Sequence, residues 1–172
     1  MNKSPNEQIF TLSNHYTVTS SHQQIITSPN HQIITSTKSP LQLMKIAVLG
    51  AGNMGLSFSK SFLKYELIKP ENLHLVTRKK EKVNKISRNF PGSKVSVFSD
   101  LKTIEADLVI IAVKPQDFQF VAENISFQFK ENQMVLSIMA GIKIEKIQKF
   151  LNHKKVVRAM PNSPTLLGMG IT

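Results

Sequence analysis

The chain has 172 residues, enough for one domain and short for two, and 41% of them are hydrophobic. It has no cysteine, which excludes disulfides and cysteine-based metal sites, and no apolar run reaches the length of a membrane span. The net charge of +11 comes from scattered Lys and Arg residues with one tight cluster, Arg78-Lys79-Lys80, and without a zinc-finger or RNA-binding signature. It therefore indicates attraction to anions in general, and we expect neither nucleic acid nor a membrane as a partner.

Residues 1–43 differ in composition from the rest of the chain. They are rich in Ser, Thr, Asn, Gln and His, and they contain two near-copies of a short repeat, His22-Gln-Gln-Ile-Ile-Thr-Ser and His31-Gln-Ile-Ile-Thr-Ser. A repeat this short cannot build a core, so we predict a disordered low-complexity extension before a folded domain at 44–172. The histidines here have no carboxylate or thiol at ligand spacing, so no metal site is predicted.

The sequence suggests two origins for this extension. Met44 directly precedes the first predicted strand, which makes it the natural start and residues 1–43 an extension or a misassigned upstream stretch. A transit peptide is the weaker alternative, because Ser is plentiful but Arg and an apolar signal core are absent.

The folded part begins with a short apolar strand, Ile46–Leu49, followed by Gly50-Ala-Gly-Asn-Met-Gly55 and a predicted helix at 54–67. A strand, Gly-x-Gly-x-x-Gly and a helix in this order are typical of dinucleotide-binding domains. Gly50 permits the tight turn, Gly52 lets a pyrophosphate approach the backbone, and Gly55 lets the helix pack closely on the strand. The helix N-terminus offers unpaired N–H groups to phosphates. The alternative is an ordinary glycine-rich turn.

The end of the second predicted strand, 73–76, indicates which dinucleotide is preferred. An NAD-binding domain places Asp or Glu here for the ribose 2′-hydroxyl, whereas an NADP-binding domain needs cationic or hydroxyl groups for the 2′-phosphate. The sequence continues Thr77-Arg78-Lys79-Lys80, without a carboxylate until Glu81. A solvated basic helix start explains this cluster less well, because cations are unfavourable at the positive end of a helix dipole. The pattern favours NADP(H), with NAD(H) as the alternative.

Helices and strands alternate along the remaining chain. We predict strands at 95–98, 108–113, 134–138 and from Val156, with helices at 81–90, 116–125 and 144–151 and a short helix or turn at 100–106. This order predicts an α/β Rossmann-like doubly wound parallel sheet. Ligands bind beyond the carboxyl ends of such strands, so Ala112–Pro115 should line the cofactor crevice. The small residues after the strand at 134–138 leave room for a nicotinamide ring or its ribose.

Five motifs follow one another along the chain: Gly50-Ala-Gly-Asn-Met-Gly55, Ala112-Val-Lys-Pro115, Ser137-Ile-Met-Ala-Gly141, Arg158-Ala-Met-Pro-Asn162, and Pro164 with Gly168-x-Gly170-x-Thr172. With them, residues 44–172 resemble the cofactor domain of the pyrroline-5-carboxylate reductase family. In that family NAD(P)H reduces the C=N bond of 1-pyrroline-5-carboxylate to give L-proline, which completes proline biosynthesis. The resemblance implies an oxidoreductase that acts on a small cyclic imine carboxylate in the cytoplasm.

The resemblance also implies the site residues, which fall into four groups along the cofactor. They are Leu49, Gly50, Ala51, Gly52, Asn53, Met54 and Gly55 at the pyrophosphate; Arg78 with Lys79 at the adenosine phosphate; Ala112, Val113, Lys114 and Pro115 along the cofactor; and Ile138, Met139 and Ala140 near the nicotinamide. Asn162 would lie close to the ring and the substrate, and the catalytic residues are otherwise unknown. Hydride transfer needs no nucleophile–base pair, and Ser137 and Ser163 lack an evident His partner.

This chain departs from the family at its end. Family members continue into a helical domain that forms a dimer and completes the substrate site, whereas this chain stops at Thr172. We therefore expect it to bind NADP(H) but to reduce its substrate feebly or not at all alone, with an apolar face left uncovered. Two alternatives stay open: a non-catalytic NADP-binding module, and a related NADP-dependent reductase of imines or keto acids.

Overall fold

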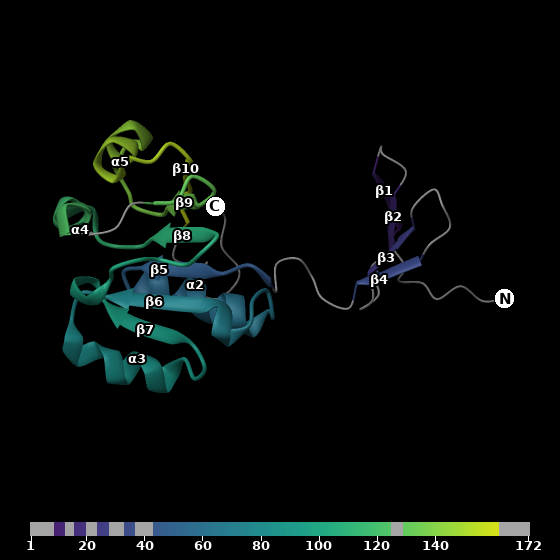
Figure 1. Ribbon diagram of the computed structural model, residues 1–172, viewed down its shortest axis with the longest axis horizontal. Helices are drawn as coiled ribbons and strands as arrows, with labels where there is room; N and C mark the ends of the chain where they lie inside the picture. Colours follow the sequence, from purple (N-terminus) through teal and green to yellow (C-terminus); the bar gives the residue numbers. More distant parts are fainter. Residues whose placement is uncertain are drawn as a thin grey trace. The chain divides into compact units, whose positions relative to one another are not determined.

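The structure, a computed structural model, describes residues 43–124 and 129–161, together with the backbone of four short strands within residues 9–36. The chain divides into two compact units, Met1–Pro40 and Leu41–Thr172. The second unit contains a six-stranded sheet in the order β10-β9-β8-β5-β6-β7 (Figure 1), and every neighbouring pair in it is parallel. The predicted Rossmann-like doubly wound sheet is therefore confirmed.

The strands of this sheet are β5 (Ile46–Leu49), β6 (Leu73–Thr77), β7 (Lys94–Val97), β8 (Leu108–Ile111), β9 (Met134–Ser137) and β10 (Val156–Arg158). The α-helices between them are α2 (Asn53–Lys64), α3 (Val83–Asn89), α4 (Phe118–Asn124) and α5 (Ile144–Leu151). Four 3₁₀ turns complete the described part of this unit: η1 (Pro70–Asn72), η2 (Lys80–Lys82), η3 (Phe98–Asp100) and η4 (Pro115–Asp117). The helices predicted at 81–90 and 116–125 thus begin as 3₁₀ turns.

The central strand β5 is buried on both faces, as its unbroken apolar run predicts. Ala47 and Leu49 belong to a core cluster that includes Phe118 of α4 and Ile147 of α5. Ile46 and Val48 belong to a second cluster, against which α2 and α3 pack. Because successive side chains of a strand point to opposite faces, these two clusters form the cores on either side of the sheet.

Helix α2 ends at Lys64, three residues before the predicted end. Glu66 adopts φ +54°, and the N–H of Leu67 donates to the carbonyl of Phe62 at 2.9 Å. A left-handed residue with this backward hydrogen bond is a common way to close a helix. Pro70 follows three residues after Leu67 and opens η1.

The candidate site lies where the strand order of the sheet reverses. β5 pairs with β6 on one side and with β8 on the other. All three strands are parallel, so their carboxyl ends, followed by Gly50, Arg78 and Ala112, meet at one edge of the sheet. In open α/β sheets this reversal point is where ligands bind.

The N-terminal unit contains strands that the sequence analysis did not anticipate. β1 (Ile9–Leu12) pairs antiparallel with β2 (Tyr16–Thr19), and β3 (Gln24–Thr27) with β4 (Ile33–Ser36). β3 and β4 come from the two copies of the repeat, whose Ile- and Thr-rich sequences favour extended structure. A two-stranded pair is marginally stable alone in water, so disorder of the extension in solution stays a prediction.

Candidate functional site

The glycine loop after β5 is held by both neighbouring strands. The N–H groups of Gly50 and Ala51 both donate to the carbonyl of Val76 at the end of β6, at 2.9 and 3.0 Å. Gly50 adopts φ +108°, and a Cβ added there would lie 2.8 Å from the backbone of Ala112 and Val113. The tight turn predicted at Gly50 is therefore confirmed, and it also requires close approach to the end of β8.

Gly55 and Gly52 have different surroundings. A Cβ on Gly55 would lie 2.2 Å from the carbonyl oxygen of Gly50 and 3.1 Å from Val48, which confirms its predicted role in packing α2 onto β5. A Cβ on Gly52 would meet nothing within 4 Å, because it would project into open space. That space is free for a ligand to approach the backbone, although contact with a pyrophosphate stays a prediction.

The N-terminus of α2 lacks its own counter-charge. Gly52 is the N-cap, no side chain caps the helix, and its first turn contains no acidic residue. The exposed N–H groups and the positive end of the helix dipole therefore remain available for an anion. The open space beside Gly52 and the uncapped helix end together form a cradle, at which the sequence analysis predicts a diphosphate.

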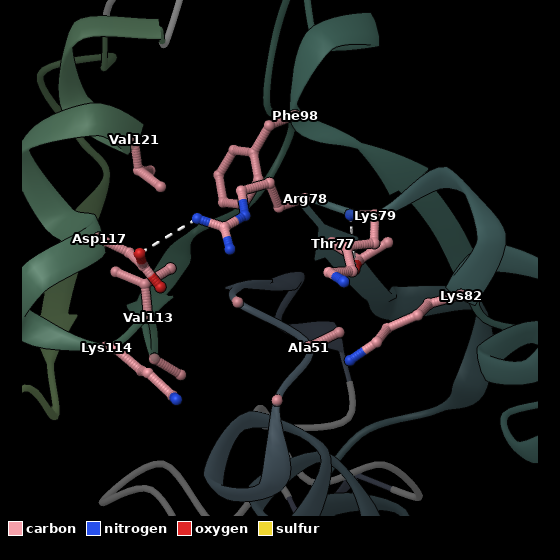
Figure 2. A pocket seen from close by; sticks show the side chains of 13 residues that line it. Ala51, Thr77, Arg78, Lys79, Lys82, Phe98, Val113, Lys114, Asp117 and Val121 are labelled. Atoms are coloured by element: carbon pink, nitrogen blue, oxygen red, sulfur yellow. Dashed lines mark hydrogen bonds and ion pairs between the residues drawn. The ribbon is translucent and has the colours of Figure 1, made fainter.

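A cavity of about 270 Å³ lies beside this cradle (Figure 2), lined by Gly50, Ala51, Gly52, Thr77, Arg78, Lys79, Lys82, Phe98, Ala112, Val113, Lys114, Asp117 and Val121. The structure thus brings together eight of the predicted cofactor residues, from the segments after β5, β6 and β8. Phe98, Val113 and Val121 form an apolar part of the lining, whereas most of its charged residues are cationic.

The charged lining residues make few contacts with one another. Arg78 donates from Nη1 to Oδ1 of Asp117 at 3.1 Å, and Figure 2 shows its side chain directed across the cavity toward that carboxylate. Lys79 lies 3.6 Å from Glu81 in an exposed ion pair. Lys82 points into the cavity in Figure 2. The wall is therefore suited to an anionic group such as a phosphate.

The other predicted residues lie outside this lining. Leu49, Asn53 and Pro115 are chain neighbours of lining residues, and Met54 and Gly55 follow in the first turn of α2. Ile138, Met139 and Ala140 follow β9; Met139 is 2% exposed and packs in the core, whereas Ala140 is exposed. Asn162 and the motif from Pro164 onward lie outside the described residues. Contact of all these residues with a cofactor stays a prediction.

The sequence analysis missed five lining residues: Thr77, Lys82, Phe98, Asp117 and Val121. Lys82 could have been found from its spacing, because it lies three residues after Lys79 and a 3₁₀ turn brings such residues to one side. Asp117 follows β8 closely enough to reach the same sheet edge. This position was the only feature of the sequence that could have indicated it.

Among the described residues, no helix is long and apolar enough to cross a membrane. In the same part of the chain, no three His, Asp or Glu side chains are grouped in a way that could hold a metal ion.

The sheet order and the glycine loop at its reversal point define a pyridine-dinucleotide-binding domain of the Rossmann type. Residues 45–141 match the family described as NADP oxidoreductase, coenzyme F420-dependent, and the chain belongs to this family.

Among curated relatives, the chain is similar to pyrroline-5-carboxylate reductase of Aquifex aeolicus, with 36% identity over 131 residues, 74% of this chain and 46% of that protein. Among solved structures, it is similar to the Coxiella burnetii pyrroline-5-carboxylate reductase, with a TM-score of 0.64 and 25% identity over 74% of this chain and 47% of that one. A Plasmodium falciparum pyrroline carboxylate reductase with NADP bound matches with a TM-score of 0.59 and 25% identity, over 76% of this chain and 47% of that one.

The resemblance to pyrroline-5-carboxylate reductases is therefore confirmed. The chain spans about half the length of the curated relatives that it matches.

Proposed function

We propose that this chain is the NADP(H)-binding part of an oxidoreductase that reduces 1-pyrroline-5-carboxylate to L-proline in proline biosynthesis. One observation carries the proposal: the cavity beside the open glycine loop has a basic wall, in a chain 36% identical to a pyrroline-5-carboxylate reductase. The NADP bound in the Plasmodium falciparum relative supports the choice of cofactor.

The described residues fit the parts of such a cofactor. The diphosphate would rest beside Gly52, where an added Cβ would meet nothing within 4 Å, and on the uncapped N-terminus of α2. Arg78, Lys79 and Lys82 would hold the 2′-phosphate. When bound, NADPH supplies a hydride to the carbon of the substrate C=N bond.

Other residues of the chain would bind and orient the nicotinamide end of the cofactor and the substrate. The backbone of 138–140 follows β9, whose neighbour in the sheet is β8, so it would position the nicotinamide end. Asn162 would approach the ring and the substrate. We propose that residues 1–172 in isolation turn over slowly, because they match about half of the length of the related reductases. A small cyclic imine carboxylate as substrate and a cytoplasmic location belong to the same proposal.

Titration of the purified chain with NADPH and NADH tests the cofactor part of the proposal. We expect NADPH to bind about tenfold more tightly, because only its 2′-phosphate can use the basic wall. Circular dichroism checks that the sample is folded. A folded sample that takes up neither dinucleotide would overturn the proposal.

A turnover assay tests the reaction. NADPH consumption is followed with 1-pyrroline-5-carboxylate, with and without a C-terminal domain supplied from a related reductase, and with a keto acid as the competing substrate class. We expect proline formation to rise when the domain is supplied. Dinucleotide binding without turnover in any arm would favour the non-catalytic module, and preference for the keto acid would favour a different reductase.

A further inference from the structure

The contact between Arg78 and Asp117 joins two separate parts of the cavity wall. Arg78 follows β6, and Asp117 ends the 3₁₀ turn η4 after β8, 39 residues later. Their atoms Nη1 and Oδ1 lie 3.1 Å apart, and the two side chains are 50% and 32% exposed. An ion pair this exposed adds little to stability, so the contact is not needed to hold the fold together.

This contact places a carboxylate where an anionic ligand needs a cation. Arg78 is the strongest candidate for the 2′-phosphate, because a guanidinium can bind a phosphate through two parallel N–H groups. One of its terminal nitrogens already donates to Asp117, and Figure 2 shows the side chain directed toward that residue. A phosphate entering the cavity must share or displace this hydrogen bond, and it also meets the negative charge of Asp117.

Lys82 does not share this constraint. Its side chain points into the cavity beside Ala51, on the side of the cavity away from Asp117 (Figure 2). Of the three cations proposed for the 2′-phosphate, Arg78 pairs with Asp117 and Lys79 lies 3.6 Å from Glu81, whereas the ion pairs found among the described residues do not include Lys82.

We propose that Asp117 is a specificity-determining residue, which weakens binding of the phosphorylated dinucleotide by competing with its 2′-phosphate for Arg78. The inference rests on the proposed function, because it assumes that this cavity takes NADP(H). Asp117 acts through Arg78 and does not itself need to touch the cofactor. It reduces the preference for NADPH over NADH below the value that the basic wall alone would give.

The test is a double-mutant cycle measured by titration with NADPH and with NADH. Asp117→Asn keeps the size of the side chain and removes its charge, so NADPH should bind about fivefold more tightly while NADH changes by less than about twofold. In the Arg78→Gln background, Asp117→Asn should bring a much smaller gain, because only the direct repulsion between the carboxylate and the phosphate is then removed. The gain in the single variant should also shrink at high salt.

Glu123→Gln is the matched control, because it removes one carboxylate from α4 outside the cavity and should leave the ratio of the two affinities unchanged. Asp117→Ser repeats the test if Asp117→Asn melts at a lower temperature. If the wild-type chain binds neither dinucleotide, the proposed function fails. If it binds NADPH but the variants bind it equally or less tightly, or bind both dinucleotides more tightly to the same extent, only the role of Asp117 is overturned.

Discussion

The two halves of the sheet, β5–β7 and β8–β10, have the same alternation of strands and helices. They differ in the turn that follows the first strand of each half. After β5, the chain enters α2 through glycines, with no acidic residue in the first turn of the helix. After β8, it enters η4 through Pro115 and places Asp117 in that turn. The helix start in the first half is therefore open to an anion, whereas the second half supplies a carboxylate of its own. Residues at one turn, rather than the fold, therefore determine which helix start is open to an anion.

The largest effect is expected from adding a side chain at Gly55, where α2 packs on β5. Gly55→Ala would place a Cβ 2.2 Å from the carbonyl oxygen of Gly50, which is backbone and cannot move aside. We expect a loss of about 3 kcal/mol in the free energy of unfolding, measured by chemical denaturation. A stability equal to that of the wild type would mean that α2 does not pack on β5 as described.

A second test concerns His74, a histidine of β6 that is only 7% exposed. Burial, and to a lesser extent the nearby charge of Lys94, lowers the pKa of His74 to about 4. The unfolded chain protonates His74 near its usual pKa of 6.5, so it binds more protons than the folded state between these values.

Stability should therefore fall as the pH drops from about 6.5 toward 4, by about 2 kcal/mol at pH 5 from this residue. His74→Gln, which can still bond to Ser96, should remove that part of the pH dependence. Denaturation of both proteins at pH 7 and pH 5 measures it. Equal losses in both would show that His74 does not stay neutral in the folded state.

The third test changes the ligand side of the glycine loop without disturbing the fold. A Cβ on Gly52 meets nothing within 4 Å, and the residue has an ordinary φ of −92°. Gly52→Ala should therefore cost less than about 1 kcal/mol of stability, mainly from a poorer N-cap. It should weaken NADPH binding about tenfold by filling the diphosphate cradle. Unchanged affinity in a titration would place the diphosphate elsewhere.

The smallest effect is expected at the basic wall. Lys82→Gln removes one cation from the cavity and should weaken NADPH binding about threefold, with less effect on NADH. Lys80→Gln is the matched control, because Lys80 belongs to the same 3₁₀ turn but does not line the cavity. Equal effects of the two variants would indicate a general response to net charge rather than contact with the 2′-phosphate.

Local patterns in the sequence were sufficient for the sheet and the glycine loop. The apolar run 46–49 and the spacing of Gly50, Gly52 and Gly55 depend on neighbours in the chain, and the structure confirms the strand, the tight turn and the close packing. The helix at 144–151 was predicted with its observed bounds, because its apolar spacing is regular.

Contacts between distant segments were not predictable in the same way. Arg78 and Asp117 meet only because β6 and β8 flank β5, so their carboxyl ends share an edge. The early end of α2 depends on the left-handed conformation of Glu66, which its residue type does not favour. The pairing of β3 with β4 was not predicted, because one copy of the repeat is too short to form a core, although two copies can pair with one another.

The carbonyl of Val76 accepts hydrogen bonds from two consecutive amides of the glycine loop, and Arg78 follows it two residues later. The glycine loop proposed to bind the diphosphate is thereby preassembled, so a nucleotide that binds there would spend little of its binding energy on ordering the loop. Because the basic residues directly follow the same strand, exchanging the side chains at 77–82 should change cofactor preference without rebuilding the glycine loop. A shift of the Val76 backbone would alter both properties together.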